Sequence, residues 1–110
     1  MRRGEVWWVD FGAPVGRRPA VLVSRDQAYR LRTSVTVVPL TRRVRGIPVE
    51  VSLGTEEGIP VKSVANADSI MTVPRARCTA YVTTLSPEHM EAVGRAISFA
   101  LGLPARSASE

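Results

Sequence analysis

The chain has little of the residue types that build common enzyme sites. Its 110 residues include one cysteine, Cys78, and one histidine, His89. A single cysteine cannot form a disulfide within the chain, and one of each residue cannot supply a Cys/His zinc site. His89 is expected within a helix, apart from any candidate nucleophile, which argues against a Ser-His-Asp triad. We therefore expect no metal, no cofactor and a reducing compartment, the cytoplasm.

Long hydrophobic runs and clustered acidic residues are also missing. The longest apolar stretches, such as residues 20–23 (AVLV), are far too short to cross a bilayer. The opening residues 1–3 (MRR) are not followed by the apolar segment of a signal peptide. Scattered carboxylates give no sign of a two-metal nuclease site. We expect neither a secreted nor a membrane protein.

What the chain does have is arginine. The formal net charge is +5, the pI is about 10.6, and every basic residue other than Lys62 and His89 is arginine. The planar guanidinium binds phosphate through two hydrogen bonds and stacks on bases. This excess predicts a nucleic-acid partner. The alternative explanation is a G+C-rich genome that favours arginine codons.

Apolar patterning predicts a mainly β chain in one domain, residues 1–103, followed by a Ser/Ala-rich disordered tail, residues 104–110. One helical turn is expected within residues 25–32. Pro39 must lie at a strand end or a sheet edge, because it lacks the N–H donor of a ladder. The expected strands span residues 5–10, 19–24, 33–40, 47–53, 61–67 and 76–85.

The last segment predicts a helix with defined ends. Ser86 suits the N-cap, Pro87 the first turn, and Gly102 the position after the last turn. The face expected to be buried carries Met90, Val93, Ile97 and Leu101. Short strands followed by one amphipathic helix predict a small, strongly bent barrel of the SH3-like or OB kind, with the helix packed across it.

Three short segments combine basic side chains with hydroxyl groups or strand ends. They are residues 17–19 (RRP), 40–43 (LTRR) and 62–63 (KS). If the second and third strands pair antiparallel, Arg18 and Thr41 lie at the same end of the sheet. There a guanidinium would stabilise the charge on a pentacoordinate phosphorus, and the hydroxyl would orient an oxygen. A surface arginine and an ordinary strand-end threonine remain the alternative.

Five segments, in order, carry a family resemblance: RGEVWWVDF at 3–11, RPAVLVS at 18–24, VPLT at 38–41, KSVANADSI with the following TV at 62–73, and LSPE at 85–88. With them, nearly the whole chain resembles the MazF/PemK family of toxin endoribonucleases. The loop at residues 12–17 lacks the Ser-Glu-Gln segment of many members and looks like the short loop of actinobacterial-like members. Substrate contacts made by that loop elsewhere cannot be transferred.

The resemblance implies an SH3-like barrel of the MazF/PemK/CcdB type with a C-terminal helix, assembled as a homodimer. It implies sequence-specific, metal-independent cleavage of single-stranded RNA (mRNA, tRNA or rRNA) that inhibits translation and growth. The RNA's own 2′-hydroxyl would attack, leaving a 2′,3′-cyclic phosphate and a 5′-hydroxyl. The key arginine and threonine of the family fall on Arg18 and Thr41. A cognate antitoxin with an acidic, flexible segment would silence the enzyme.

Further residues are expected to contact RNA. Those on the chain's basic segments would hold the phosphate backbone, and Arg42 and Arg43 have a solvated turn as the alternative. Asn66 and Asp68 would read base edges, or else form a turn at a strand end. Trp7 and Trp8 point to opposite faces, so that only one can face the core. The expected RNA-binding set is Arg17, Ser24, Arg42, Arg43, Lys62, Asn66 and Asp68.

Two other functions fit the same fold. A gyrase poison depends on a C-terminal Trp-Gly-Ile-like end, which residues 101–104 (LGLP) do not supply. A non-catalytic RNA-binding barrel, or a degenerate toxin, is disfavoured because both Arg18 and Thr41 are present.

Overall fold

The computed structural model describes residues 1–104, so the predicted tail, apart from Pro104, lies outside the described residues. The expected mainly β fold with a closing helix is confirmed. The elements are β1 (Glu5–Asp10), β2 (Arg17–Leu22), α1 (Ala28–Leu31), β3 (Ser34–Thr41), β4 (Glu50–Leu53), η1 (Thr55–Glu57), β5 (Ser63–Asn66), η2 (Ala67–Ser69), β6 (Met71–Pro74), η3 (Arg75–Arg77), β7 (Cys78–Thr84) and α2 (Pro87–Ala100).

The strands form one antiparallel sheet in the order β4-β5-β3-β2-β1-β7. The remaining strand, β6, also pairs with β3. The long strand β3 pairs with β2 along one edge. On its other edge it pairs first with β6, through Val37, and then with β5, from Leu40 onward. Pro39 falls in the gap between these two ladders, so its missing N–H interrupts neither of them. The expectation that Pro39 lies at a strand end or a sheet edge is nevertheless wrong, because Pro39 lies inside a central strand, opposite Ala20 of β2.

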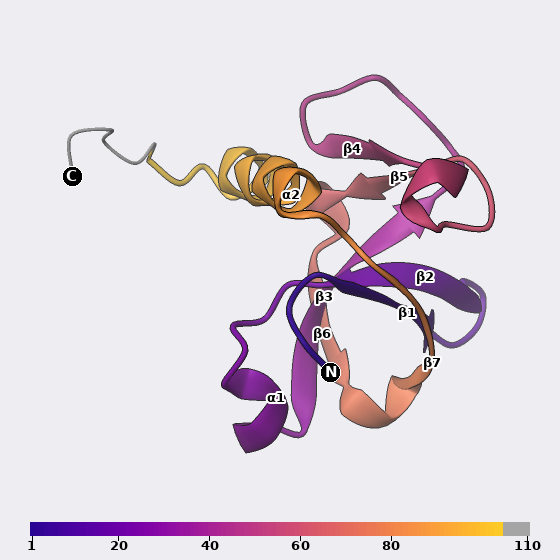
Figure 1. Ribbon diagram of the computed structural model, residues 1–110, viewed down its shortest axis with the longest axis vertical. Coiled ribbons are helices and arrows are strands. Elements are labelled where there is room, and N and C mark those ends of the chain that lie inside the picture. Colours follow the sequence, from indigo (N-terminus) through magenta and orange to yellow (C-terminus); the bar gives the residue numbers. More distant parts are fainter. Residues whose placement is uncertain (105–110) are drawn as a thin grey trace.

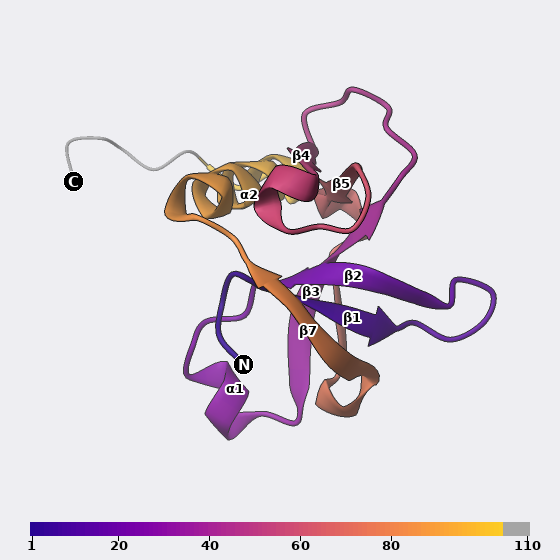
Figure 2. The same cartoon turned by 45° about the vertical axis from the view of Figure 1, so that its right-hand side comes forward.

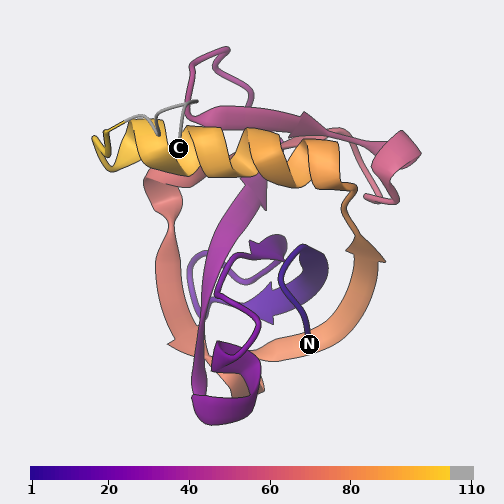
Figure 3. The same ribbon diagram turned by 60° about the vertical axis from the view of Figure 1, so that its left-hand side comes forward.

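The sheet bends around β3. Figure 1 shows β1, β2, β6 and β7 in one part of the molecule, with α2, β4 and β5 together in the other. The view in Figure 2 keeps this division. Figure 3 shows β3, in magenta, running from the region of α1 up to α2. The change of partner strand along β3 is thus the point where the barrel turns and where the helix covers it.

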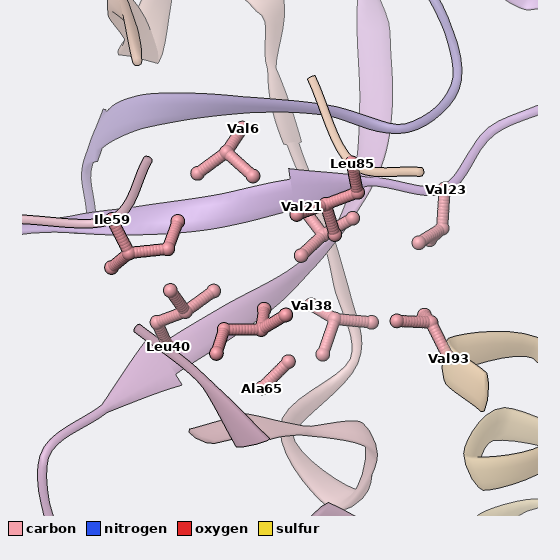
Figure 4. Close-up of a cluster of buried hydrophobic side chains, with 10 residues drawn as sticks. Val6, Val21, Val23, Val38, Leu40, Ile59, Ala65, Leu85 and Val93 are labelled. Carbon is pink, nitrogen blue, oxygen red and sulfur yellow. The ribbon is translucent and has the colours of Figure 1, made fainter. Parts of the chain in front are cut away.

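The core has two main clusters because β2 and β3 are buried on both faces, and a third, small cluster holds Val49, Ala67 and Ala96. Val21 and Val38 pack with Val93 of α2 in the first cluster, which Figure 4 shows. Their neighbours Ala20 and Val37 point the other way, into a second cluster with Tyr29 of α1. Successive strand residues face opposite sides, so a strand buried on both sides is apolar throughout. This explains the unbroken apolar run that predicted a buried second strand.

The predicted ends of α2 are confirmed. The Ser86 hydroxyl accepts a hydrogen bond from the His89 amide at 3.2 Å, and Pro87 occupies the first turn. At the other end Gly102 has a φ of 66°, and the amides of Gly102 and Leu103 donate to the carbonyls of Phe99 and Ser98. This is the Schellman pattern of helix termination.

The face of α2 is confirmed in part. Val93 is buried, and Met90 and Ile97 pack against the first cluster. Leu101 was expected there and is instead 54% exposed. It is the C-cap, one turn beyond Ile97, where the helix has already passed the buried cluster.

Three predicted strands are too long, and one strand was missed. The strand expected at 76–85 spans only Cys78–Thr84, after the turn η3. The strand expected at 47–53 begins only at Glu50, and Ile47 is exposed. The Glu50 carboxylate accepts from the amides of Arg45 and Gly46 and holds residues 45–49 in a turn. The strand expected at 61–67 begins at Ser63. The missed strand is β6, in which only Val73 is buried, so it carries no alternating signal.

Gly58 lies where the η1 turn packs closely against β7. Its φ is +86°, and an added Cβ would meet the Thr83 hydroxyl at 2.6 Å. Gly102 also has a positive φ, of +66°, but faces open space. We expect Gly102→Ala to lower the free energy of unfolding by about 1 kcal/mol, from backbone strain alone. Gly58→Ala should lose about 3 kcal/mol, because the clash adds to that strain.

The two variants are compared by urea denaturation followed by circular dichroism. Equal losses would contradict the close packing of Gly58 against Thr83.

Candidate active site

An open cleft of about 540 Å³ lies where the ends of β2 and β3 meet the segment before β5. No carboxylate lines it, and four arginines do, so the cleft holds most of the chain's excess positive charge. The arginines come from the start of β2 and from the turn after β3. The full lining is Trp8, Val15, Arg17, Arg18, Pro19, Leu40, Thr41, Arg42, Arg43, Pro60, Val61 and Ser63.

Strand pairing brings Arg18 and Thr41 together. β2 and β3 are antiparallel, as the sequence argument required, with Ala20 opposite Pro39 and Val21 opposite Val38. Arg18 and Thr41 lie two residues beyond this ladder on their own strands, and both line the cleft. Both residues are half-buried. The predicted antiparallel pairing of the two strands is confirmed; the catalytic roles of Arg18 and Thr41 stay a prediction.

The Thr41 hydroxyl is held in a defined orientation. Its oxygen accepts a hydrogen bond from the Arg43 amide at 3.2 Å, which closes the turn after β3. Because the oxygen acts as acceptor in this bond, the hydroxyl hydrogen remains available to a ligand in the cleft. The same turn presents the exposed side chains of Arg42 and Arg43 to the cleft.

The two tryptophans have different surroundings. Trp8 lines the cleft, and the guanidinium carbon of Arg17 lies over its ring, 5.2 Å from the centroid. Trp7 packs edge-on against Tyr81, with 6.2 Å between the ring centroids, and donates from Nε1 to Glu5 at 2.9 Å. Both tryptophans are half-buried. Of the two, Trp7 is the one that packs against the core, at the second cluster.

Four of the predicted RNA-binding residues do not line this cleft. Ser24 lies at the other end of β2, where its hydroxyl accepts from the Thr36 amide at 2.8 Å. Lys62 lines a hollow beside η1. The Asn66 side chain accepts from the Asp68 amide at 2.9 Å, which is the turn that the sequence left as an alternative. Contact of these four with RNA stays a prediction.

Sequence reasoning missed part of the lining. Val15, Pro60 and Val61 line the cleft and carry no chemical signal in the sequence. Ser63 belonged to a segment that was singled out, yet it is 4% exposed and its hydroxyl donates to the Val61 carbonyl at 2.9 Å. Only the tertiary structure shows that these side chains form the apolar wall of an arginine cleft.

The two groups with clearly shifted pKa values lie outside the cleft. Burial raises the pKa of Tyr29 to about 12, although Ser24 nearby partly offsets it. Burial also raises the pKa of the Cys78 thiol, against the effect of Arg75. Both residues belong to the second core cluster. A buried thiol with a raised pKa is a poor nucleophile, which leaves arginine and hydroxyl groups as the reactive chemistry of the cleft.

The sequence placed His89 apart from any candidate nucleophile, but the structure sets a serine hydroxyl beside its ring. Its Nδ1 lies 2.7 Å from the Ser86 hydroxyl, and its Nε2 lies 3.8 Å from the Glu57 carboxylate. This is the order of groups in a catalytic triad. The Ser86 oxygen, however, also caps α2, and the opposite Glu57 oxygen accepts from the Gly54 amide at 2.6 Å. The three side chains therefore tie the start of the helix to η1.

Within residues 1–104, no three His, Cys, Asp or Glu side chains are grouped to hold a metal ion. Over the same residues, no helix is long and apolar enough to cross a membrane.

The comparison with protein families is decisive. Residues 2–101 match the model of the PemK-like, MazF-like toxins of type II toxin–antitoxin systems. The chain belongs to this family. The match spans every strand and helix described above, so the arginine cleft lies within the PemK/MazF-type region.

Several relatives of the chain come from mycobacteria. It is 40% identical over 101 residues to "Probable endoribonuclease MazF5" of Mycobacterium tuberculosis, covering 90% of this chain and 91% of that protein. It is 38% identical over 91 residues to "Probable endoribonuclease MazF2" of the same species, covering 82% and 87%. Among solved structures, an endoribonuclease in complex with its cognate antitoxin from a mycobacterial species has a TM-score of 0.86 and 32% identity, covering 96% of this chain and 99% of that one.

Ser86→Ala separates a helix cap from a catalytic serine. Loss of an N-cap hydroxyl costs about 1 kcal/mol, so we expect a small drop in the urea midpoint. The rate of RNA cleavage should match that of the wild type. A large loss of cleavage at unchanged stability would instead make Ser86, His89 and Glu57 a reactive group in this PemK/MazF-type domain.

Proposed function

We propose that this protein is the toxin of a type II toxin–antitoxin pair and acts as a sequence-specific endoribonuclease on single-stranded RNA. One observation supports it most: a cleft lined by four arginines and no carboxylate, with Arg18 and Thr41 on facing strands, in a PemK/MazF-type domain. The mycobacterial relatives carry the name endoribonuclease. The positive cleft attracts a polyanion, and the paired side chains supply a place for one phosphodiester.

The proposed reaction uses the RNA itself as nucleophile. The 2′-oxygen attacks the adjacent phosphorus, and the bond from phosphorus to the 5′-oxygen of the next nucleotide breaks. The 2′-hydroxyl proton leaves and the 5′-oxygen gains one, so the products are a 2′,3′-cyclic phosphate and a 5′-hydroxyl. Negative charge builds on the non-bridging oxygens in the transition state. DNA lacks the 2′-hydroxyl and is not a substrate.

Arg18 and Thr41 would have different roles in this reaction. The Arg18 guanidinium carries a fixed positive charge with several N–H donors, which suits the oxygens of a pentacoordinate phosphorus. It can also donate a hydrogen bond to the departing 5′-oxygen, which takes its proton from water while the 2′-hydroxyl proton passes to water. The Thr41 hydroxyl, fixed by the Arg43 amide, would donate to a phosphate oxygen and set the in-line geometry. Arg42 and Arg43 would hold flanking phosphates.

Cleavage of a long single-stranded RNA in EDTA tests this proposal, with the new ends mapped by sequencing. We expect cyclic phosphate and 5′-hydroxyl ends. Arg18→Ala should lower the cleavage rate by about 1,000-fold, in line with the loss of a transition-state donor, and Thr41→Val by about 100-fold. Both variants should remain folded by circular dichroism.

The matched control is Arg30→Ala. It removes one positive charge from the exposed surface of α1, away from the cleft, and should cleave at the wild-type rate. RNA left intact by the wild type would end the nuclease proposal. An Arg18→Ala variant as fast as Arg30→Ala would remove Arg18 from the chemistry.

We further propose that the protein works in the cytoplasm and is silenced there by a cognate antitoxin. The cleft offers four guanidinium groups to an acidic, flexible segment, which would then compete with RNA for one surface. Because the solved mycobacterial relative is in complex with its antitoxin, such a partner fits this fold. An antitoxin that binds without displacing RNA would contradict a shared surface.

A homodimer is the third part of the proposal. The end of α2 exposes Phe99 and Leu101, at 63% and 54%, and Phe99 borders a hollow shared with β4. Exposed apolar groups of this size mark contact surfaces. We expect light scattering to give the mass of a dimer for the wild type and of a monomer for Phe99→Asp. A monomeric wild type would contradict the homodimer. A dimeric Phe99→Asp variant would place the dimer contact elsewhere.

A further inference from the structure

We propose that Arg17, whose guanidinium lies over the Trp8 ring, is a shelf on which one nucleobase of the bound RNA stacks. The inference rests on the proposed function, because it needs RNA in the cleft. It assigns to Arg17 a contact with a base rather than with a phosphate. It also places that base near the phosphodiester at Arg18, since both arginines line the same cleft.

Pairing of β1 with β2 sets Arg17 over Trp8. Trp8 is opposite Pro19, and Asp10 is opposite Arg17, so Trp8 and Arg17 are diagonal neighbours on one face of the two strands. Diagonal neighbours are within reach of long and aromatic side chains. The guanidinium carbon of Arg17 lies over the Trp8 ring, 5.2 Å from its centroid, which is within the range of a cation–π contact.

A small hydrogen-bond network fixes the guanidinium in this position. Nη2 of Arg17 donates to the Thr79 hydroxyl at 3.2 Å, and that hydroxyl donates in turn to the Trp8 carbonyl at 3.3 Å. The residue itself is exposed. The side chain is therefore ordered before any ligand binds, which lowers the entropy that a contact costs.

The free surface of this guanidinium suits a base better than a phosphate. A phosphate is gripped through the N–H groups at the edge of the guanidinium plane, and part of that edge is committed to Thr79. One side of the group is covered by Trp8. Arg17 is otherwise exposed and lines the cleft, and single-stranded bases stack on arginine planes as they do on aromatic rings. Trp8, Arg17 and the base would form three layers.

Stacking of this kind strengthens binding at one nucleotide without reading its hydrogen-bonding edge. Every base has a π face, so the shelf should tolerate all four bases. Its loss should appear in RNA affinity and KM, while kcat stays near the wild-type value. A phosphate contact at the same position would depend on the charge of Arg17 alone.

The experiment compares Arg17→Lys with the wild type. Lysine keeps the positive charge and has no planar group to stack. The probe is a short RNA that contains one cleavage site, made uncleavable by a 2′-deoxy substitution at that site. A series of such RNAs carries an abasic ribose at each flanking nucleotide in turn, and Kd is measured at several salt concentrations.

For the wild type, we expect an abasic ribose at one flanking position to weaken binding about tenfold. Arg17→Lys should weaken the binding of intact RNA by the same factor, and the abasic ribose should then cost nothing more. The dependence of log Kd on log salt should be unchanged, because the number of charges is unchanged. In a Trp7→Phe background, Trp8 is the remaining tryptophan, and its fluorescence should respond to intact RNA more than to the abasic one.

Arg17→Lys with wild-type affinity would overturn the inference and leave Arg17 as a phosphate contact. Equal abasic costs in both proteins would overturn it as well. If the wild type does not bind the RNA at all, the proposed function itself fails. If the wild type binds and cleaves RNA, but the cost of an abasic ribose does not depend on Arg17, the proposed function stands and only the shelf is refuted.

Discussion

The antiparallel pairing of β2 with β3 is the constraint on which the rest of the structure depends. Both strands are buried on two faces, so their register fixes which side chains enter each of the two main core clusters. A slip by one residue would exchange those faces along both strands. The strand pair that buries Val21 against Val38 also carries Arg18 and Thr41, which line one cleft. Core packing and the geometry of the candidate active site therefore cannot vary independently.

The cleft concentrates charge at the end of that strand pair. Four guanidinium groups share one surface without a lining carboxylate. Like charges brought together repel each other, which costs folding free energy and makes the surface attractive to a polyanion. Two of these arginines stand at the start of β2, and the other two stand in the turn after β3. Trp8 and Thr79 hold one of them, and the Arg43 amide orients the Thr41 hydroxyl. The site is thus ordered by local contacts before a ligand arrives.

Local chemistry made much of the fold predictable. Ser86 and Gly102 mark the ends of α2 through interactions with their own helix, so no distant residue is needed to read them. The apolar run of β2 signals burial on both faces. The predictions failed where a partner outside the strand determines its extent or its existence. Glu50 binds the amides of the preceding turn and shortens β4, and β6 forms on the edge of β3 although it buries only Val73.

The sequence by itself determined the fold class, the closing helix, the family resemblance and the importance of Arg18 and Thr41, because these follow from local patterns and motifs. Only the tertiary structure decided which other side chains join them. It separates Ser24 from the cleft by the length of β2, sets Arg17 over Trp8, and brings His89 to Glu57. The physical reason is that such contacts join residues far apart in the chain, and strand register and the bend of the sheet fix their distances.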